Sequence, residues 1–309
     1  MPLRLACFGL PLAPYLLSLD GHDVRLSVLA PVGGLGGRRL RRTIGDGRVL
    51  DAGALGSALE AEVDDALERE APDLVVSWFW TRRLPARWLE RAPLGAIGVH
   101  PSLLPRHRGP DPYFGAIDAG DAESGVSVHR LTERYDDGEV VAQRRLPIGS
   151  RDAWQLARAL DRPSIAALRS CVATLSRGER LPSVAQDERL ASWAPEPTGE
   201  ALRADFRWPT ERVLRRIRAL APLPGLALSI EGLELTVTAA SAAEGAPRAL
   251  DPGEAAVAGE PSALLIRTGD AAVRIERATR DPDGTPLSGP EIGAVVREHL
   301  ARLGRAACR

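Results

Sequence analysis

The stretch GAIGVHPSLLPRHRGPDPYFGAIDAGDAESGVSVHRLTERYDDGEVVAQ, residues 95–143, decides the fold. It contains strand-like runs at 96–100 and 126–131 and opens a third at 140–146. Short aliphatic and β-branched runs bounded by Gly and Pro are typical of buried strands. Similar runs occur earlier, at residues 3–8, 24–29 and 74–78. Because these runs alternate with helical patterns, the sequence predicts an α/β domain with a doubly wound, mostly parallel, Rossmann-like sheet.

A histidine stands where such a sheet binds its ligands. His100 ends the run 96–100, and in open α/β sheets ligands bind beyond the carboxyl ends of the strands. Pro101 and Pro105 follow, and each proline disfavours a helical conformation for the residue before it, so the loop must run extended. His100 is therefore a candidate catalytic group. The alternative is a histidine that simply packs at a strand terminus.

An acidic turn lies between the strand-like runs 126–131 and 140–146. Asp136 and Asp137 precede Gly138, and the glycine allows a positive φ there. A carboxylate from this turn can reach His100, orient the imidazole and favour its protonated form, giving a group that moves a proton at neutral pH. Turn aspartates are common, so a solvated turn is the alternative.

The last third of the chain predicts a second, smaller domain. Residues 182–199 carry three prolines and little periodicity, as a linker does. A helical pattern over 210–219 and a closing one near 290–303 flank several strand-like runs, which indicates a β-rich, OB-like domain. The predicted domains are 1–187, a linker at 188–203, and 204–309. The runs of the second domain are 226–230, 233–239, 264–268 and 273–278.

Other segments give weaker patterns. The apolar run 5–19 is interrupted by Gly9, Pro11 and Pro14, so we interpret it as a first strand and turn and not as a leader peptide. Helical patterns over 153–160 and 164–175 predict two helices before the linker. No apolar stretch reaches 18 residues, so no membrane span is expected.

Composition excludes several classes of chemistry. The 309 residues include 40 basic and 41 acidic side chains, for a net charge of −1, which argues against binding nucleic acid through a bulk positive field. All the basic residues are arginine, and asparagine is absent. A Schiff-base lysine, a P-loop lysine and an asparagine oxyanion donor are therefore excluded. The three cysteines lie far apart and predict neither a disulfide framework nor a metal site, which favours the cytoplasm.

Several motifs together resemble one enzyme family. The string HPSLLPRHRG at 100–109, the GVSVH strand at 125–129 and the Asp-x-Gly turn at 136–138 resemble the formyltransferases that use 10-formyltetrahydrofolate. The resemblance extends over nearly the whole chain. Trp193-Ala194-Pro195, Asp205 and the segment 217–225 resemble the linker and C-terminal domain of methionyl-tRNA formyltransferases in particular.

The resemblance implies a catalytic set of asparagine, histidine and aspartate. The matching positions here are Gly98, His100 and Asp136, so the asparagine is missing. In the family, a primary amine attacks the formyl carbon on N10 of the folate, the asparagine and the protonated histidine stabilise the oxyanion, and the aspartate supports the histidine. Loss of one oxyanion donor typically costs about 100-fold to 1000-fold in turnover.

Three interpretations of Gly98 stay open. Another donor, such as Ser102, a backbone N–H or a water, takes over with reduced transfer; a different substrate fills the gap; or the protein binds folate without useful turnover. On the first interpretation, Gly98→Asn is expected to raise turnover.

No metal is implied. Residues predicted to bind folate are Ser102, Leu103, Leu104, Pro105, Arg108, Asp137, Gly138 and Trp80.

Some of these residues have plainer interpretations. Trp80 stacks on a pterin ring or fills core space, and Arg108 lines the site mouth or is solvated. The basic segment 33–42 resembles by position the loop that tRNA formyltransferases place against the acceptor stem; a solvated loop is the alternative. His129 is more typical of family members that act on small amines. The residues predicted to contact substrate are Arg38, Arg39, Arg41, Arg42 and His129.

The resemblance thus implies a formyltransferase of one-carbon metabolism that acts in translation initiation. It would transfer a formyl group from 10-formyltetrahydrofolate to the amine of initiator methionyl-tRNA. The alternatives are a formyltransferase for a small amine, such as an amino sugar or an amino-acid derivative, and a folate-binding protein without catalysis. We expect a cytoplasmic protein, with a monomer favoured over an oligomer.

Overall fold

The computed structural model describes residues 1–31, 35–53, 57–243, 250–259 and 261–304. The chain divides into two compact units. Unit 1 comprises Met1–Pro112, Ser124–Leu146 and Ala159–Ala194, and unit 2 comprises Tyr113–Glu123, Pro147–Arg158 and Pro195–Arg309. The predicted domain boundaries, including the linker, remain a proposal.

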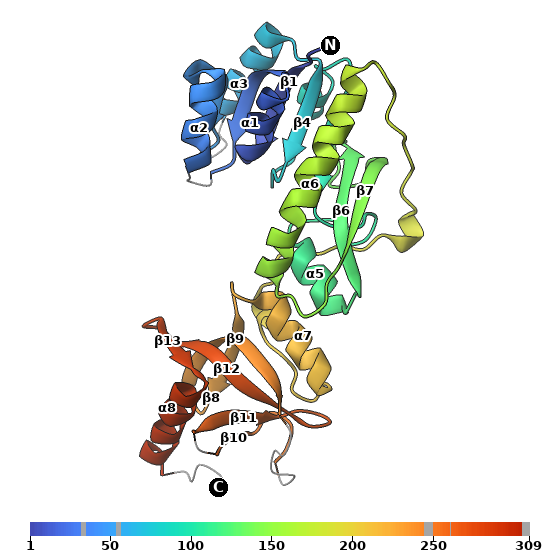
Figure 1. The fold of residues 1–309 in the computed structure, drawn as a ribbon. Coiled ribbons are helices and arrows are strands. Elements are labelled where there is room, and N and C mark those ends of the chain that lie inside the picture. The colour runs from blue at the N-terminus through green and yellow to red at the C-terminus, as the bar shows by residue number, and fades with distance from the viewer. Residues whose placement is uncertain (32–34, 54–56, 244–249, 260, 305–309) are drawn as a thin grey trace. The chain divides into compact units, whose positions relative to one another are not determined.

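The sheet of unit 1 has seven strands in the order β3-β2-β1-β4-β5-β6-β7. Figure 1 labels β1, β4, β6 and β7 of this sheet. Neighbours from β3 to β5 pair in parallel, and β6 pairs antiparallel with β5. The predicted α/β class and mostly parallel sheet are confirmed. The strands are β1 (Arg4–Gly9), β2 (Asp23–Leu29), β3 (Val49–Asp51), β4 (Leu74–Trp78), β5 (Ala96–His100), β6 (Glu123–Arg130) and β7 (Val140–Pro147).

Buried aliphatic residues explain why the central strands form. Every residue of β4 and β5 is buried, as expected for strands covered on both faces. A core cluster joins Phe8 and Val28 of the sheet to Val63 of α3 and to Trp88 of α4. The helices before β7 are α1 (Leu12–Leu19), α2 (Leu35–Ile44), α3 (Ser57–Glu70), α4 (Ala86–Leu89) and α5 (Pro112–Ala119).

Two N-terminal segments differ from the sequence predictions. The turn expected within 5–19 is helix α1, because Pro14 lies in the first helical turn, where the backbone N–H has no intrahelical partner to lose. The loop expected at 33–42 is largely helix α2. Leu40 and Ile44, four residues apart, pack in one apolar cluster and hold this helix to the sheet. Residues 32–34 lie outside the described part of the chain.

The two helices predicted on either side of Pro163 are one helix, α6 (Ala153–Ser176). A proline inside a helix removes one backbone hydrogen bond and usually interrupts the helix. Here Leu156, Leu160, Leu168 and Val172 are all fully buried, so a single apolar stripe continues past the proline. Packing of that stripe outweighs the lost hydrogen bond.

Unit 2 contains the predicted β-rich domain. Its sheet has the order β10-β11-β12-β9-β8, with β13 also paired to β12, and the pairings are antiparallel (Figure 1). Helices α7 (Thr210–Leu220) and α8 (Gly289–Arg302) flank the strands in sequence, as predicted. The strands are β8 (Leu226–Ile230), β9 (Leu233–Ala243), β10 (Ala255–Ala258), β11 (Ala263–Arg267), β12 (Ala272–Arg280) and β13 (Thr285–Ser288).

Candidate active site

His100 is fixed at the carboxyl end of β5 by its own loop. Its side chain is nearly buried, and its Nε2 lies 2.7 Å from the carbonyl oxygen of His107. Because a carbonyl only accepts, this contact assigns the Nε2 proton to His100 and turns Nδ1 toward the Asp136 turn. Ser102 Oγ stiffens the loop by donating to the Arg106 carbonyl at 2.6 Å.

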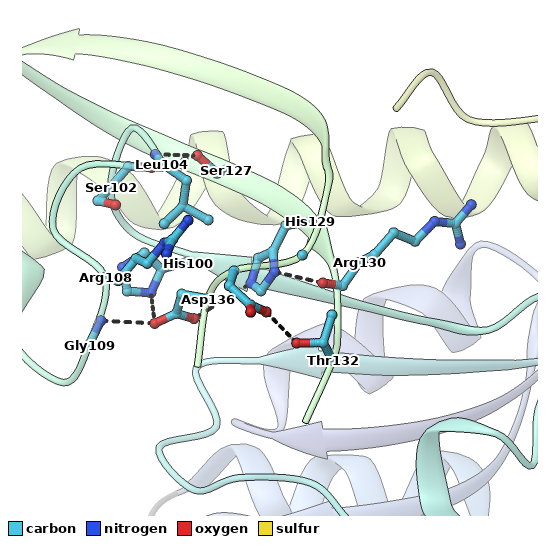
Figure 2. A network of polar contacts seen from close by, with 12 residues as sticks. His100, Ser102, Leu104, Arg108, Gly109, Ser127, His129, Arg130, Thr132 and Asp136 are labelled. Atoms are coloured by element: carbon cyan, nitrogen blue, oxygen red, sulfur yellow. Dashed lines mark hydrogen bonds and ion pairs between the residues drawn. The ribbon is translucent and has the colours of Figure 1, made fainter. Parts of the chain in front are cut away.

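Asp136 meets His100 as the sequence predicted. Asp136 Oδ2 lies 3.5 Å from His100 Nδ1 and accepts a hydrogen bond of 2.9 Å from the backbone N–H of Gly109 (Figure 2). The Asp136 side chain is only 16% exposed. A carboxylate held this way orients the imidazole and faces Nδ1, which suits the pair to proton transfer.

The turn itself differs from the prediction at Gly138. The left-handed residue is Asp136, with φ +55°, and Gly138 is not among the residues with positive φ. Aspartate tolerates that conformation better than most residues. Gly138 is needed for a different reason, since a Cβ atom there would stand 1.9 Å from the carbonyl oxygen of Arg130.

His129 forms the other wall of the site. Its Nε2 lies 3.6 Å from Asp136 Oδ1, and its Nδ1 lies 2.9 Å from the carbonyl oxygen of Arg130 (Figure 2). Burial, the largest cause, lowers the pKa of His129 to about 4; the Asp136 charge opposes this shift and His100 adds to it. His129 is therefore neutral at neutral pH, with its proton on Nδ1 and a lone pair on Nε2.

Gly98 lies directly opposite His129 in the β5–β6 ladder. A Cβ atom at Gly98 would stand 2.5 Å from Leu131 Cδ2 and 3.5 Å from His129 Nε2. The side chain of Leu131 thus fills the space that a larger residue at position 98 would need. The structure brings Gly98, His100, His129 and Asp136 together.

The loop residues predicted to bind folate lie along the same edge. Ser102 and Leu104 are buried, and Leu104 N–H donates to Ser127 Oγ at 3.1 Å. Leu103 is partly buried and packs at Gly125, where a Cβ atom would stand 2.5 Å from Leu103 Cδ2. Pro105, also partly buried, accepts a hydrogen bond from the backbone N–H of Ser192.

Two further predicted folate contacts have protein partners. Asp137 accepts a hydrogen bond from Thr132 Oγ1 and pairs with Arg134 at 2.7 Å. Trp80 packs edge-on against Phe8 at the rim of the core, with ring centroids 5.8 Å apart. Its indole Nε1 is buried and has no hydrogen-bond partner in the part of the chain that the structure describes, so a donor is available there.

The predicted substrate arginines lie on helix α2. Arg38, Arg39 and Arg42 are exposed, and Arg39 stacks over the Tyr15 ring at 5.1 Å. Arg41 instead pairs with Asp46 at 2.9 Å and with Asp51 at 2.5 Å. Three of the four side chains therefore face solvent, and the fourth is engaged within unit 1.

The sequence prediction missed Gln186. Its Nε2 donates to the carbonyl oxygens of Asp136 and Gly138, each at 2.7 Å. Gln186 belongs to the segment 182–199, which shows little periodicity, so nothing in the local sequence points to a role. The role of Gln186 becomes visible only in the folded structure, where its side chain lies beside the Asp136 turn, 50 residues away in the chain.

The described residues form neither a metal cluster nor a membrane-spanning helix. No group of three or more His, Cys, Asp or Glu side chains is arranged to hold a metal ion in that part of the chain. None of its helices is long and apolar enough to span a membrane.

This chain is similar in sequence to known proteins. The family model described as "Formyl transferase" matches residues 49–163, and "Formyl transferase, C-terminal domain" matches residues 198–294. The methionyl-tRNA formyltransferase of Janthinobacterium sp. (strain Marseille) is 34% identical over 234 residues, which cover 75% of this chain and 72% of that protein.

Solved structures share the fold. HypX from Aquifex aeolicus, solved in complex with tetrahydrofolic acid, matches with a TM-score of 0.68 at 21% identity over 96% of this chain, which spans about half (48%) of HypX. The sugar 3N-formyl transferase WlaRD, solved in the presence of dTDP and 5-N-formyl-THF, matches with a TM-score of 0.62 at 13% identity and covers 91% of this chain and 98% of its own. The family matches and the close relative together establish that this chain belongs to the formyl transferase family and is a formyltransferase.

Proposed function

We propose that this formyltransferase moves the formyl group of 10-formyltetrahydrofolate to the amine of methionyl-tRNA in the cytoplasm. The buried contact between His100 and Asp136 at the end of β5 carries the proposal. Transfer to an amine requires the amine to lose a proton and N10 of the folate to gain one, and this pair is built to move protons. The name of the Janthinobacterium relative supports tRNA as the acceptor.

The chain's own residues fit a folate donor. The loop 101–105 lies at the ligand-binding edge of the sheet. The indole N–H of Trp80, which has no hydrogen-bond partner among the described residues, offers a buried donor beyond the neighbouring strand β4. Bound 10-formyltetrahydrofolate supplies the activated formyl group. His100 places its imidazole beside the site for proton transfer and Asp136 orients that ring, while neutral His129 presents an acceptor lone pair at Nε2.

The α2 arginines suggest how RNA is recognised. Arg38, Arg39 and Arg42 are exposed along one short helix, so a phosphate backbone can reach them. Each phosphate contact makes affinity more salt-dependent, by about 0.7–0.9 in the slope of log K against log salt. Arg41, already paired with two aspartates, is the internal control.

The test measures formyl transfer from the folate to charged initiator tRNA across a salt series. We expect transfer by the wild type, and a weaker tRNA affinity with a smaller salt slope in the triple variant Arg38→Gln/Arg39→Gln/Arg42→Gln. Arg41→Gln is expected to keep the wild-type slope. Folate binding without transfer to any amine would overturn the proposal.

A second candidate is formylation of a small amine. His129 favours it, because its buried Nε2 stands 3.6 Å from Asp136 and gives a free amino group a second acceptor. Under this candidate, charged tRNA is inert while an amino sugar or amino-acid derivative consumes the formyl group. The same assay with a panel of small amines separates the two candidates.

A further inference from the structure

The segment 184–194, called the strap here, touches both catalytic loops of unit 1. At one end, Val184 pairs with Val140, just after the Asp136 turn, through two hydrogen bonds of 2.9 Å. At the other end, Trp193 forms an isolated parallel β-bridge with Arg108, which lies in the loop after His100. The strap thus connects the histidine loop to the aspartate turn through backbone contacts on both.

Gln186 provides the side-chain link between them. Its amide nitrogen donates to the Asp136 and Gly138 carbonyl oxygens, which bracket the turn, at 2.7 Å each. Its Oε1 accepts from Arg108 Nε at 3.1 Å and Nη2 at 2.8 Å. Because a guanidinium can only donate, Arg108 fixes which way the amide faces. Both hydrogens and the oxygen of the amide are therefore used.

Arg108 is itself held in place by other residues of the strap. Its side chain is 12% exposed, and Nη2 pairs at 2.8 Å with Glu188, which is 70% exposed. The backbone of Arg108 is also fixed, since its N–H donates to Ser192 and its carbonyl accepts from Ala194. The order of contacts is Glu188, Arg108, Gln186 and then the Asp136 turn.

We infer that Gln186 is a positioning residue, oriented by Arg108, that holds the Asp136 carboxylate against His100. The Asp136 side chain accepts a hydrogen bond from the backbone N–H of Gly109, and the position of its own backbone decides whether it also meets the imidazole. A catalytic group misplaced by about 1 Å can cost on the order of 100-fold in rate. The inference rests on formyl transfer at His100 and Asp136, as proposed above.

The kinetic test uses Gln186→Met, Arg108→Met and the double variant. Methionine keeps the length of glutamine without its hydrogen bonds. We expect each single variant to lower kcat about tenfold or more, with the folate KM of Gln186→Met within about twofold of the wild type. The double variant should be no slower than the worse single one, because both changes break one chain of contacts. Gln155→Met, at an exposed glutamine of α6, is the matched control with unchanged kcat.

Independent, additive effects of the two changes would overturn the inference, as would a fall in melting temperature with kcat per folded molecule unchanged. A second readout needs no turnover. In NMR spectra of the five histidine rings, the His100 and His129 signals should move in both variants, while those of His22 and His299 stay in place. Unmoved His100 and His129 signals would refute the positioning role even if the wild type formylates no tRNA.

Discussion

Two turns of this protein contain an Asp-Gly pair, at residues 137–138 and 283–284, but their aspartates differ in burial and in the residues that they contact. Asp136 lies in the Asp-Asp-Gly turn between β6 and β7, and Asp283 precedes Gly284 between β12 and β13. Asp283 is 45% exposed, and its partners are Arg280 and Thr285, two or three residues away; the hydrogen bond from Arg280 lowers its pKa. Asp136 is 16% exposed and meets Gly109, His100 and His129. Asp283 thus interacts with residues of its own turn, whereas Asp136 contacts residues from other parts of the chain.

The largest effect should separate the two aspartates. Asp136→Asn removes the charge that orients His100, so we expect kcat for formyl transfer to fall about 100-fold to 10,000-fold. Asp283→Asn changes a solvated turn and should leave kcat as in the wild type. Parallel assays of both variants at equal folded concentration decide the matter. Similar kcat values for the two would mean that Asp136 has no special role.

Substitutions at the glycines of the two turns, Gly138 and Gly284, should lower the free energy of unfolding by different amounts. A Cβ atom at Gly138 would meet the Arg130 backbone, which cannot move aside, so Gly138→Ala and Gly138→Asn should each cost about 3 kcal/mol. Gly284 has φ +68° and open space around it. There Ala should cost about 1 kcal/mol and Asn less, because asparagine tolerates the left-handed region. Urea unfolding of the four variants measures the difference; equal costs for Asn at both positions would contradict it.

The smallest expected effect concerns Gly98, beside the Asp136 turn. Gly98→Asn alone should bring little gain in turnover, because Leu131 occupies the space that the new side chain needs. Adding Leu131→Ala makes room, and an amide placed there as an oxyanion donor should raise kcat about tenfold over Leu131→Ala alone. An equal gain in the single variant would show that Leu131 is no obstacle. No gain in the double variant would show that another group already supplies the donor.

Sequence patterns predicted most strands of both units and the approach of His100 to Asp136. Strands 74–78, 96–100 and 226–230 have the predicted bounds, because buried aliphatic runs between turn residues are a local signal. Helices α1, α2 and the unbroken α6 were not predicted. Prolines in α1 and α6, and glycines and arginines in α2, suggested that no continuous helix would form there. Packing of an apolar stripe outweighed these local preferences in each helix.

The sequence by itself determined the α/β class and the β-rich second unit, and it predicted the two residues, His100 and Asp136, that we propose as the catalytic pair. Only the tertiary structure decided that Asp136 and not Gly138 takes the left-handed conformation, that Leu131 fills the space beside Gly98, and that Gln186 holds the turn. The physical reason is the range of the interactions. Burial patterns repeat along the chain and can be recognised locally, but a hydrogen bond or steric contact between residues tens of positions apart leaves no periodic trace in the sequence.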